Sequence, residues 1–465
     1  MSSEPKPSIE ELLAKAKKPA TLAPPLHKFY EGKVQVMAKV PVRTLRDFDF
    51  WYTPGVAEPC KLINRSVDDS FVYTNRWNYA AVVSDGTRVL GLGNIGPYAA
   101  MPVMEGKALL FKYLGGVDAF PLCADTRDPD ELIRFLELIQ PSFGAINLED
   151  IEKPKCFYVL ERAREKLEIP VWHDDQQGTA TVVLAGVLGA LDYVGKKIHD
   201  AKFAIVGAGA ANIKSLDVLE LAGANPKNIL VVDTKGILTP DRAEEIREKE
   251  KDVWKAKWAE KTNPEGKTGG IAEALEGADV LIAASRPGPG VIKPEWVNKM
   301  ASDAIVFTCA NPIPEMWPWE AKEAGAKVVG TGRSDFANQI NNSLGFPAIF
   351  RGVLDVKAKT VTDEMCVAAA KALYEFAKEN GLREDYITPT MQDWEVYPRE
   401  AVACALESIR QGVARVKPSR DELWERAVTI IRNARESVKV LMNSNLIKAP
   451  PSEEELLTTF SAKTI

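Results

Sequence analysis

The chain has 465 residues, of which 59 are Lys or Arg and 65 are Asp or Glu, so its net charge is −6 at neutral pH. This acidic balance argues against nucleic acid as the main partner, because a phosphate backbone attracts basic surfaces. No apolar run approaches the roughly 18 residues that span a bilayer, and the N-terminus lacks the apolar segment of a secretory signal. The six cysteines form no CxxC pair. We therefore expect a cytoplasmic protein of two or three domains with no membrane segment.

Residues 1–26 mix Pro, Lys and Ser around one short helical stretch at 9–16, and we expect them to form a flexible N-terminal arm. From 27 to 168, short apolar runs alternate with Gly, Pro and Asp turns, which is typical of a mixed α/β domain. Its expected strands lie at 79–84 and 119–122, and its expected helices at 103–114 and 154–167.

Strands and helices alternate regularly after residue 170, which predicts a doubly wound parallel sheet of the Rossmann type over residues 169–415. The apolar segment 179–194 is expected to be a helix buried between two layers. The charged stretch 242–270 is interpreted as a surface insertion. Residues 416–465 are assigned to a C-terminal helical extension and tail. The strands are expected at 202–206, 229–233, 280–284, 305–309 and 328–330, and amphipathic helices at 363–381 and 419–443.

A glycine-rich turn, Gly207-Ala208-Gly209-Ala210-Ala211-Asn212, follows one predicted strand and leads into a predicted helix. This context is typical of a dinucleotide fingerprint, in which the pyrophosphate lies at the helix N-terminus. Asn212 replaces the third glycine, which should loosen the contact between helix and strand. A glycine-rich turn in an α/β domain without a nucleotide is the alternative. The candidate cofactor-binding residues are Gly207, Gly209, Ala210, Ala211, Asn212, Asp233, Lys235 and Asn311.

Asp233, at the end of the second predicted strand of this fingerprint, bears on the choice of cofactor. Its carboxylate can accept hydrogen bonds from the ribose hydroxyls of NAD and would repel the 2′-phosphate of NADP. Lys235 could pair with that phosphate, but an exposed ion pair contributes only about 0–1 kcal/mol. We therefore expect NAD, with NADP as the alternative.

A second glycine run, at residues 91–96, matches the pattern GxGxxG better than the first. Pro97 follows it at once, and no strand that ends in an acid lies at the right distance beyond it. A lone GxGxxG is weak evidence for nucleotide binding. We interpret this run as a tight turn that brings backbone close to the substrate or to the facing domain.

Two acidic pairs, Glu149-Asp150 and Asp174-Asp175, stand where predicted strands end and predicted helices begin. Helix N-capping needs one carboxylate per helix and would explain half of each pair. If the two pairs converge, they make an oxygen-rich site suited to Mg²⁺ or Mn²⁺. Spacing alone leaves both interpretations open.

Lys107 lies on the apolar stripe of a predicted helix, where a lysine either extends to water or has a lowered pKa. The second case would make it a general base near neutral pH. Tyr52 precedes a Pro-Gly turn, and taken alone it is either a packing aromatic or a phenol held at a loop edge.

Amide side chains follow two predicted strands, at Asn311 and at Asn341-Asn342. The carboxyl ends of parallel strands are where open α/β sheets bind ligands, so these amides are candidates for substrate binding. Arg88 is either an exposed charge or a clamp for a substrate carboxylate.

Together and in this order, these motifs resemble the malic enzyme family, in particular its short bacterial and archaeal form, over about residues 33–415. The tail beyond that range has no counterpart we recognise. The matching segments include YTPGVAEP, SDGTRVLGLGNIGP, VMEGKALLFK, NLEDIEKP, HDDQQGTA, VGAGAAN and QINNSLGFPAIFRG.

The resemblance implies oxidative decarboxylation of malate to pyruvate and CO₂, with reduction of NAD(P) and a divalent metal ion. It makes Tyr52 the catalytic acid and Lys107 the general base. It also implies a homodimer or larger homo-oligomer with the active site near the subunit contact. The remaining roles that it implies are metal binding by Glu149, Asp150 and Asp175, a place in the catalytic network for Asp174, and substrate binding by Arg88, Asn311 and Asn341 or Asn342.

Three alternatives stay open at this point. A malolactic-type enzyme on the same fold would keep NAD bound and release lactate. A related enzyme would act on another hydroxy acid, since Arg88 and Tyr98-Ala99-Ala100 modify a loop of the substrate domain. A catalytically silent scaffold would use the fold for assembly, although the retained Tyr52, Lys107 and carboxylates argue against it.

Overall fold

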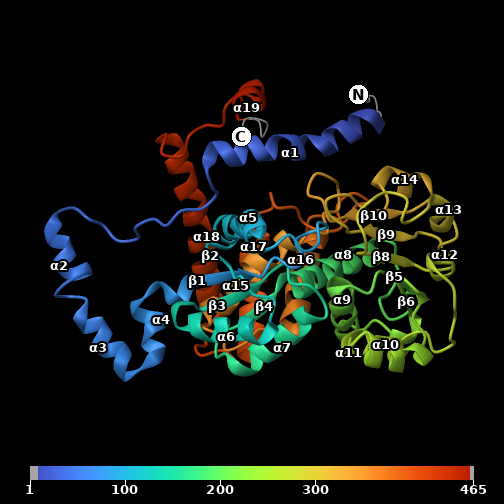
Figure 1. Cartoon of the computed structure of the whole chain (residues 1–465), viewed down its shortest axis with the longest axis horizontal. Coiled ribbons are helices and arrows are strands. Elements are labelled where there is room, and N and C mark those ends of the chain that lie inside the picture. Colours follow the sequence, from blue (N-terminus) through green and yellow to red (C-terminus); the bar gives the residue numbers. More distant parts are fainter. Residues whose placement is uncertain (1–8, 461–465) are drawn as a thin grey trace.

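The computed structural model describes residues 9–460, which form a mixed α/β structure built on two sheets (Figure 1). The first sheet has four parallel strands in the order β2-β1-β3-β4. Short, mostly apolar runs produce these strands, and two of the strands are followed at once by an acidic pair. The strands are β1 (Tyr79–Ser84), β2 (Asp118–Cys123), β3 (Ala145–Leu148) and β4 (Val171–His173).

The second sheet has six strands in the order β10-β9-β8-β5-β6-β7, and only β7 runs antiparallel to its neighbour. The order reverses direction between β5 and β8, which is the switch point where doubly wound sheets bind ligands. The predicted Rossmann-type sheet is therefore confirmed. Its strands are β5 (Phe203–Val206), β6 (Ile229–Asp233), β7 (Gly236–Ile237), β8 (Val280–Ala283), β9 (Ile305–Thr308) and β10 (Val328–Thr331).

Helices cover both sheets, and one of them, α8 (Thr179–Tyr193), lies between the two halves of the molecule (Figure 1). Its Ala, Gly, Val and Leu side chains are buried almost throughout, as the apolar sequence predicts. The other helices of these layers are α5 (Pro97–Gly115), α6 (Pro129–Ile139), α7 (Lys155–Lys166), α9 (Ala210–Leu221), α12 (Ile271–Leu275), α13 (Pro294–Val297), α14 (Pro318–Glu323), α16 (Asp363–Glu379) and α17 (Val396–Arg410).

Two late helices, α15 (Phe346–Asp355) and α18 (Arg420–Asn443), return to the first sheet and pack on α5. The Phe111 ring of α5 meets the rings of Phe346 and Phe350 edge-on, with centroids 4.6 and 4.7 Å apart. The core of the first domain is therefore completed by residues more than two hundred positions later in the chain.

The charged stretch at 242–270 is not a surface insertion, which corrects that prediction. It forms α10 (Ala243–Lys249) and α11 (Val253–Lys261), and Trp258 of α11 is fully buried in the main core. Lys257 and Glu260 of α11 are exposed, while Ala256, Trp258 and Ala259 are buried. A high average charge hid this apolar face.

The first described helix, α1 (Ile9–Tyr30), is much longer than the predicted stretch at 9–16. It packs beside α19 (Glu453–Thr459), and both lie at one side of the molecule (Figure 1). The rings of Phe29 and Phe460 meet 5.3 Å apart, and the Tyr30 hydroxyl donates to the Lys448 carbonyl. Residues 1–8 of the predicted arm lie outside the described residues. Among the helices of residues 9–460, none is long and apolar enough to cross a membrane.

A projecting arm, residues 34–69, extends from the body (Figure 1). No side chain in this range is buried, although it carries many large apolar groups. Leu45, for example, is 83% exposed and Phe50 is 72% exposed. The arm includes α2 (Phe48–Trp51) and α3 (Ala57–Arg65), and α4 (Ser70–Tyr73) connects it to the first sheet.

Candidate active site

The two acidic pairs meet at the carboxyl edge of the first sheet. Leu148 of β3 and His173 of β4 are partners in register, so the residues that follow them lie side by side. Oxygen atoms of Glu149, Asp150 and Asp175 all lie within 4.8 Å of one another. Glu149 and Asp150 are buried, and Asp175 is partly exposed. The structure therefore brings the three predicted metal ligands together.

Lys107 of α5 reaches the same cluster. Its Nζ lies 3.2 Å from Glu149 Oε1 and pairs directly with Asp174, which is fully buried. The ammonium group also lies 4.6 Å from the centre of the Phe346 ring. The predicted base and the catalytic carboxylate are thus in contact.

The expectation of a lowered lysine pKa is wrong for this arrangement. Burial lowers the pKa of Lys107, but the charges of Asp174 and Glu149 raise it by more, so that the net pKa lies above its ordinary value. A divalent cation held by the carboxylates would oppose their field at the lysine.

The cluster has more buried negative charge than positive charge. Burial raises the pKa of Glu149 well above its usual range, and burial together with the Asp175 charge raises that of Asp150 to about 7. Oδ2 of Asp150 has no hydrogen-bond partner among the described residues. Mg²⁺ and Mn²⁺ prefer carboxylate oxygens as ligands, and these carboxylates have too few positively charged partners in the protein. The residues therefore fit such an ion.

The local backbone is shaped around these carboxylates. Asp174–Gly178 forms a single π-helical turn before α8, a distortion that is frequent at functional sites. Asp150 is in the left-handed region with φ 56°, and its N–H donates to Asp175 Oδ2 at 2.8 Å. The Trp172 indole donates to Asp174 Oδ1 at 3.1 Å. These bonds fix the directions in which the carboxylates point.

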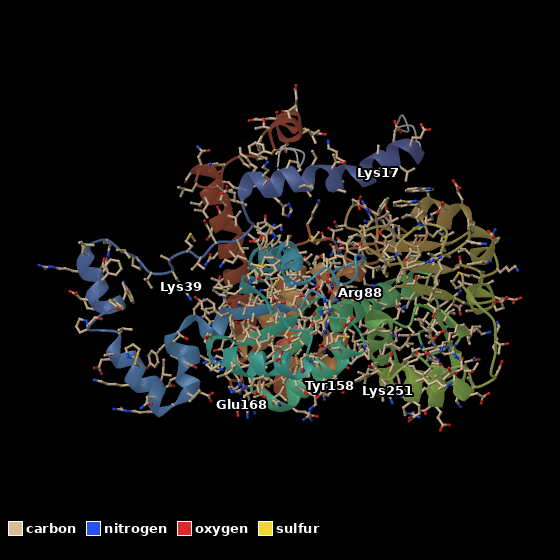
Figure 2. The ribbon with its side chains drawn as sticks, in the orientation of Figure 1. Lys17, Lys39, Arg88, Tyr158, Glu168 and Lys251 are labelled. Atoms are coloured by element: carbon tan, nitrogen blue, oxygen red, sulfur yellow. The ribbon has the colours of Figure 1, made fainter. Side chains whose placement is uncertain are left out.

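Arg88, labelled near the centre of the view in Figure 2, is joined to the cluster through its backbone. Its backbone N–H donates to the Asp150 carbonyl at 3.0 Å, and its side chain is exposed. Burial raises the pKa of Asp175, whereas the charges of Lys107 and Arg88 act to lower it. The Arg88 guanidinium is therefore within electrostatic reach of the cluster, where it can meet an anionic ligand.

The second glycine run faces the other domain. A Cβ at Gly91 would lie 2.6 Å from the Asn311 carbonyl oxygen and 2.5 Å from Pro287 Cγ. Only glycine permits this approach, which agrees with the interpretation of the run as a close-contact turn.

The structure distinguishes the two neighbouring amides. Asn341 donates to the Gly332 carbonyl and accepts from the Ser343 N–H, so both ends of its amide are used within the loop. The Asn342 amide makes no hydrogen bond with any residue in the described range, and its Cβ lies beside the π-helical turn. Asn342 is therefore the better placed of the two to bind a ligand. Asn311 is half-buried in the loop that follows β9.

Tyr52 is not near this cluster in the single chain. It follows α2 on the projecting arm and is 69% exposed. Figure 1 shows this arm at the edge of the molecule, separated from α5 and β4. The sequence motif gives the identity of the residue but carries no information about where the arm extends.

The predicted dinucleotide turn lies at the switch point of the second sheet, between β5 and α9. Gly207 has φ 97°, and a Cβ there would lie 2.6 Å from the Ala284 carbonyl oxygen at the end of β8. Asn212 does not loosen the contact between helix and strand, contrary to expectation. Its amide donates to the carbonyls of Val206 and Gly207 at 2.9 and 2.8 Å, so the longer side chain ties α9 to β5.

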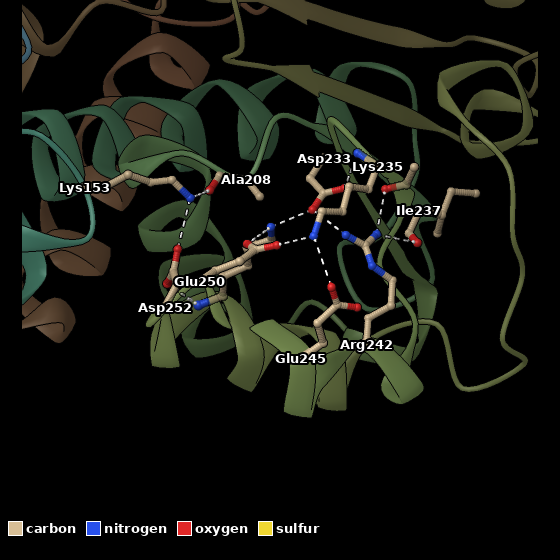
Figure 3. A network of polar contacts seen from close by, with 11 residues as sticks. Lys153, Ala208, Asp233, Lys235, Ile237, Arg242, Glu245, Glu250 and Asp252 are labelled. Carbon is tan, nitrogen blue, oxygen red and sulfur yellow. Dashed lines mark hydrogen bonds and ion pairs between the residues drawn. The ribbon is translucent and has the colours of Figure 1, made fainter. Parts of the chain in front are cut away.

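Asp233 is held by two cations that sequence reasoning missed (Figure 3). Arg242 Nη2 lies 2.6 Å and Lys255 Nζ 2.5 Å from its Oδ2, and both residues belong to the charged stretch at 242–270. Lys235 points instead to Glu250 and Glu245, at 2.9 and 3.4 Å. In the sequence, the pairing is indicated only by the basic residues that follow the strand ending at Asp233.

Glu315 is a second residue that was missed. It is fully buried and accepts hydrogen bonds from the backbone N–H groups of Ser285 and Ala310 at 2.7 and 3.0 Å. These bonds join the loops that follow β8 and β9, immediately before Asn311.

Comparisons with known proteins agree with this geometry. The family model for the malic enzyme N-terminal domain matches residues 31–164, and the one for the malic enzyme NAD-binding domain matches residues 176–409. The chain belongs to the malic enzyme family. A bifunctional malic/malolactic enzyme of Bacillus subtilis is 45% identical over 87% of this chain and 97% of its own length. The NAD-dependent malic enzyme of Geobacillus stearothermophilus is 48% identical over 83% of this chain and 78% of its own.

A solved malic enzyme from Entamoeba histolytica superposes with a TM-score of 0.94 at 46% identity, covering 99% of this chain and 96% of that one. Its coverage includes the C-terminal helices, for which the sequence alone suggested no counterpart. The chain is thus an enzyme of the malic enzyme family with its NAD-binding domain, and the resemblance drawn from the motifs is confirmed.

Proposed function

We propose that this protein oxidises malate and decarboxylates it to pyruvate and CO₂, with NAD as the oxidant and Mg²⁺ or Mn²⁺ as the metal. The observation that carries the proposal is the contact of Lys107 with Asp174 and Glu149, beside a cluster of three carboxylates. The curated relatives are named NAD-dependent, NADP-dependent or bifunctional malic enzymes.

In this reaction Lys107 would accept the proton of the malate C2 hydroxyl as a neutral amine, the form favoured when a divalent cation opposes the field of the carboxylates, and Asp174 holds the lysine in place. Arg88 and Asn342 bind the substrate carboxylates, and Tyr52 gives a proton to C3 after CO₂ has left. When bound, the divalent cation supplies Lewis-acid stabilisation of the developing enolate charge, with Glu149, Asp150 and Asp175 as its ligands.

The direct test measures NADH and pyruvate formed from L-malate in the presence of Mn²⁺. Lys107→Ala should lower kcat by about 10²–10⁴-fold, because a general base is lost. Lys107→Arg should also be inactive if the base, and not only the charge, is needed. Lys112→Ala on the same helix, where the lysine pairs with Asp118, is the matched control. A near wild-type rate for both Lys107 variants would reject the role.

We further propose that the active enzyme is a homodimer, in which the projecting arm brings Tyr52 to the site of a second copy. The arm buries none of its own apolar side chains, and Val36, Leu45 and Phe50 are each more than two-thirds exposed. An exposed apolar surface of this kind is typical of a protein–protein interface, and a second copy of the chain would bury it symmetrically.

Mixing two inactive variants tests this arrangement. Tyr52→Phe and Lys107→Ala subunits, dissociated and reassociated together, would form one complete site in each mixed dimer. Random pairing should then restore roughly a quarter of the wild-type rate. If Tyr52 acts within its own chain, the mixture stays as inactive as its components.

The preference for NAD is supported by the charges around Asp233. Its own carboxylate is paired with Arg242 and Lys255, and Lys235 is paired with Glu250 and Glu245. Every cation of this cluster is therefore paired with a carboxylate, and a 2′-phosphate would have to displace one. Asp233 itself is thus neutralised by its neighbours and does not act as a free carboxylate.

A malolactic reaction is the second candidate, because a relative that matches over 97% of its length is named a malic/malolactic enzyme. Product analysis separates the two. Lactate formed from L-malate without net NADH would indicate the malolactic reaction, and pyruvate with equimolar NADH the oxidative one.

A further inference from the structure

One loop of the first domain reaches the cofactor turn of the second. It joins β3 to α7, begins with the metal-ligand candidates Glu149 and Asp150, and carries Lys153 three residues later. Lys153 Nζ donates to the carbonyl of Ala208, the second residue of the dinucleotide turn, at 2.7 Å (Figure 3). A charged side chain from the opposite domain therefore sits on this turn.

The second partner of Lys153 is Asp252, whose Oδ2 lies 3.0 Å from Nζ. Asp252 uses its other oxygen to cap α11, because Oδ1 accepts the Lys255 N–H at 2.9 Å. Asp252 is buried, whereas 36% of the Lys153 side chain is exposed. The lysine can therefore change its direction while the aspartate stays fixed.

The chemistry at this point favours an anion. In a dinucleotide fingerprint the pyrophosphate lies against the turn and the following helix N-terminus, here α9. Two phosphate groups carry more negative charge than one carboxylate and one carbonyl. An ammonium group within hydrogen-bonding distance of the turn is thus a natural third donor, along with the backbone N–H groups and the helix.

We infer that Lys153 binds the pyrophosphate of the cofactor across the domain boundary, and that it exchanges Asp252 for a phosphate oxygen when the cofactor binds. The inference rests on the proposed use of NAD(P). It adds a ligand from the first domain to a site otherwise built by the second. Because the same loop begins with Glu149 and Asp150, cofactor binding and the metal cluster share one segment.

The test measures binding and not turnover. NADH binding is followed by fluorescence, and adenosine and ADP-ribose are titrated as competitors, since only ADP-ribose contains the pyrophosphate. Lys153→Gln should raise the Kd of NADH and of ADP-ribose about tenfold, because one charged hydrogen bond is lost. The Kd of adenosine should stay unchanged. Lys251→Gln, which removes the same charge beside Asp252, is the control. It should leave the binding of NADH and of ADP-ribose unchanged.

Asp252→Asn gives the opposite prediction. Asparagine keeps the capping oxygen but loses the charge that holds Lys153, so ADP-ribose should bind severalfold more tightly. If Lys153 only fastened the two domains, Asp252→Asn would not tighten binding and Lys153→Gln would weaken adenosine equally; either result overturns the inference. Unchanged ADP-ribose binding by Lys153→Gln overturns it as well. A wild-type protein that fails to bind NADH would overturn the proposed function itself.

Discussion

Gly178 and Asp174 are in direct contact across the π-helical turn. A Cβ on Gly178 would lie 1.9 Å from Asp174 Oδ1, which is far inside van der Waals distance. The backbone of Gly178 is helical, with φ −63° and ψ −48°, so any residue could adopt its conformation. Glycine is required at this position because the Asp174 carboxylate occupies the space of a side chain.

We expect Gly178→Ala to displace Asp174 and to break its contact with Lys107. Because positioning errors of about 1 Å can cost about a hundredfold in rate, kcat should fall by at least that factor. The fold should survive, as judged by circular dichroism. Gly270→Ala is the control, since its nearest contact would be an ordinary 3.7 Å. Equal activity of the two variants would contradict the role given to Asp174.

Removal of divalent metal should abolish turnover, and Mn²⁺ or Mg²⁺ should restore it. The buried carboxylates gain a counter-charge from the ion, so metal should also stabilise the folded protein, by about 2.7 kcal/mol at a hundredfold excess over Kd. Differential scanning fluorimetry measures this as a rise in Tm, which Asp150→Asn should reduce. Full activity in excess EDTA, with no metal found by elemental analysis, would exclude the metal site.

Glu250→Gln should shift the cofactor preference toward NADP. The substitution frees Lys235 from its nearest carboxylate, so that the lysine can pair with a 2′-phosphate. We expect the ratio of kcat/KM for NADP to that for NAD to rise severalfold, as one exposed ion pair contributes about 0–1 kcal/mol. Asp233→Ser should shift the ratio further, since it frees the Arg242 guanidinium and leaves Lys255 paired with Glu250 alone.

The control for the cofactor experiment is Glu244→Gln, which lies on α10 but does not contact Lys235. A wild-type preference for NADP, or ratios unchanged in both test variants, would show that this cluster does not select the cofactor.

Glu400→Gln should stabilise the protein at alkaline pH. Neither carboxylate oxygen of Glu400 has a hydrogen-bond partner among the described residues, and burial raises its pKa well above the usual range. In the unfolded chain this group ionises above about pH 4.5, while in the folded chain it stays protonated, so the folded state binds more protons and stability falls as pH rises.

The neutral glutamine removes that dependence. We therefore expect the Tm of Glu400→Gln to exceed that of the wild type by an amount that grows from about pH 5 to about pH 8. Glu395→Gln changes an exposed residue next to the same helix, and its Tm should differ from that of the wild type by the same amount at every pH. If the Tm difference between Glu400→Gln and the wild type becomes smaller as pH rises, Glu400 is not protonated in the folded protein.

Much of the fold was accessible from local sequence. The strands β1 and β6 were predicted with their observed bounds, because each is an apolar run closed by a polar residue or turn. The acidic pairs followed from the same logic, since neighbouring parallel strands end at one edge.

Long-range interactions were not accessible. That Arg242 and Lys255 would hold Asp233 depends on how α10 and α11 fold back, and no local pattern encodes this. Asn212 stands where the fingerprint has its third glycine, and its amide donates two hydrogen bonds to the preceding strand and turn. A motif defined by glycines does not predict these bonds. The raised pKa of Lys107 depends on Asp174 and Glu149, which follow two strands far along the chain from α5.

The packing of α15 and α18 on α5 has a consequence for how the chain acquires its structure. Phe111 finds its partners Phe346 and Phe350 only after most of the chain has left the ribosome. Such distant contacts favour slow folding and leave apolar surface open during synthesis. The segment 27–168, produced alone, should therefore aggregate, and the two halves of this enzyme should acquire their native structure as one cooperative unit.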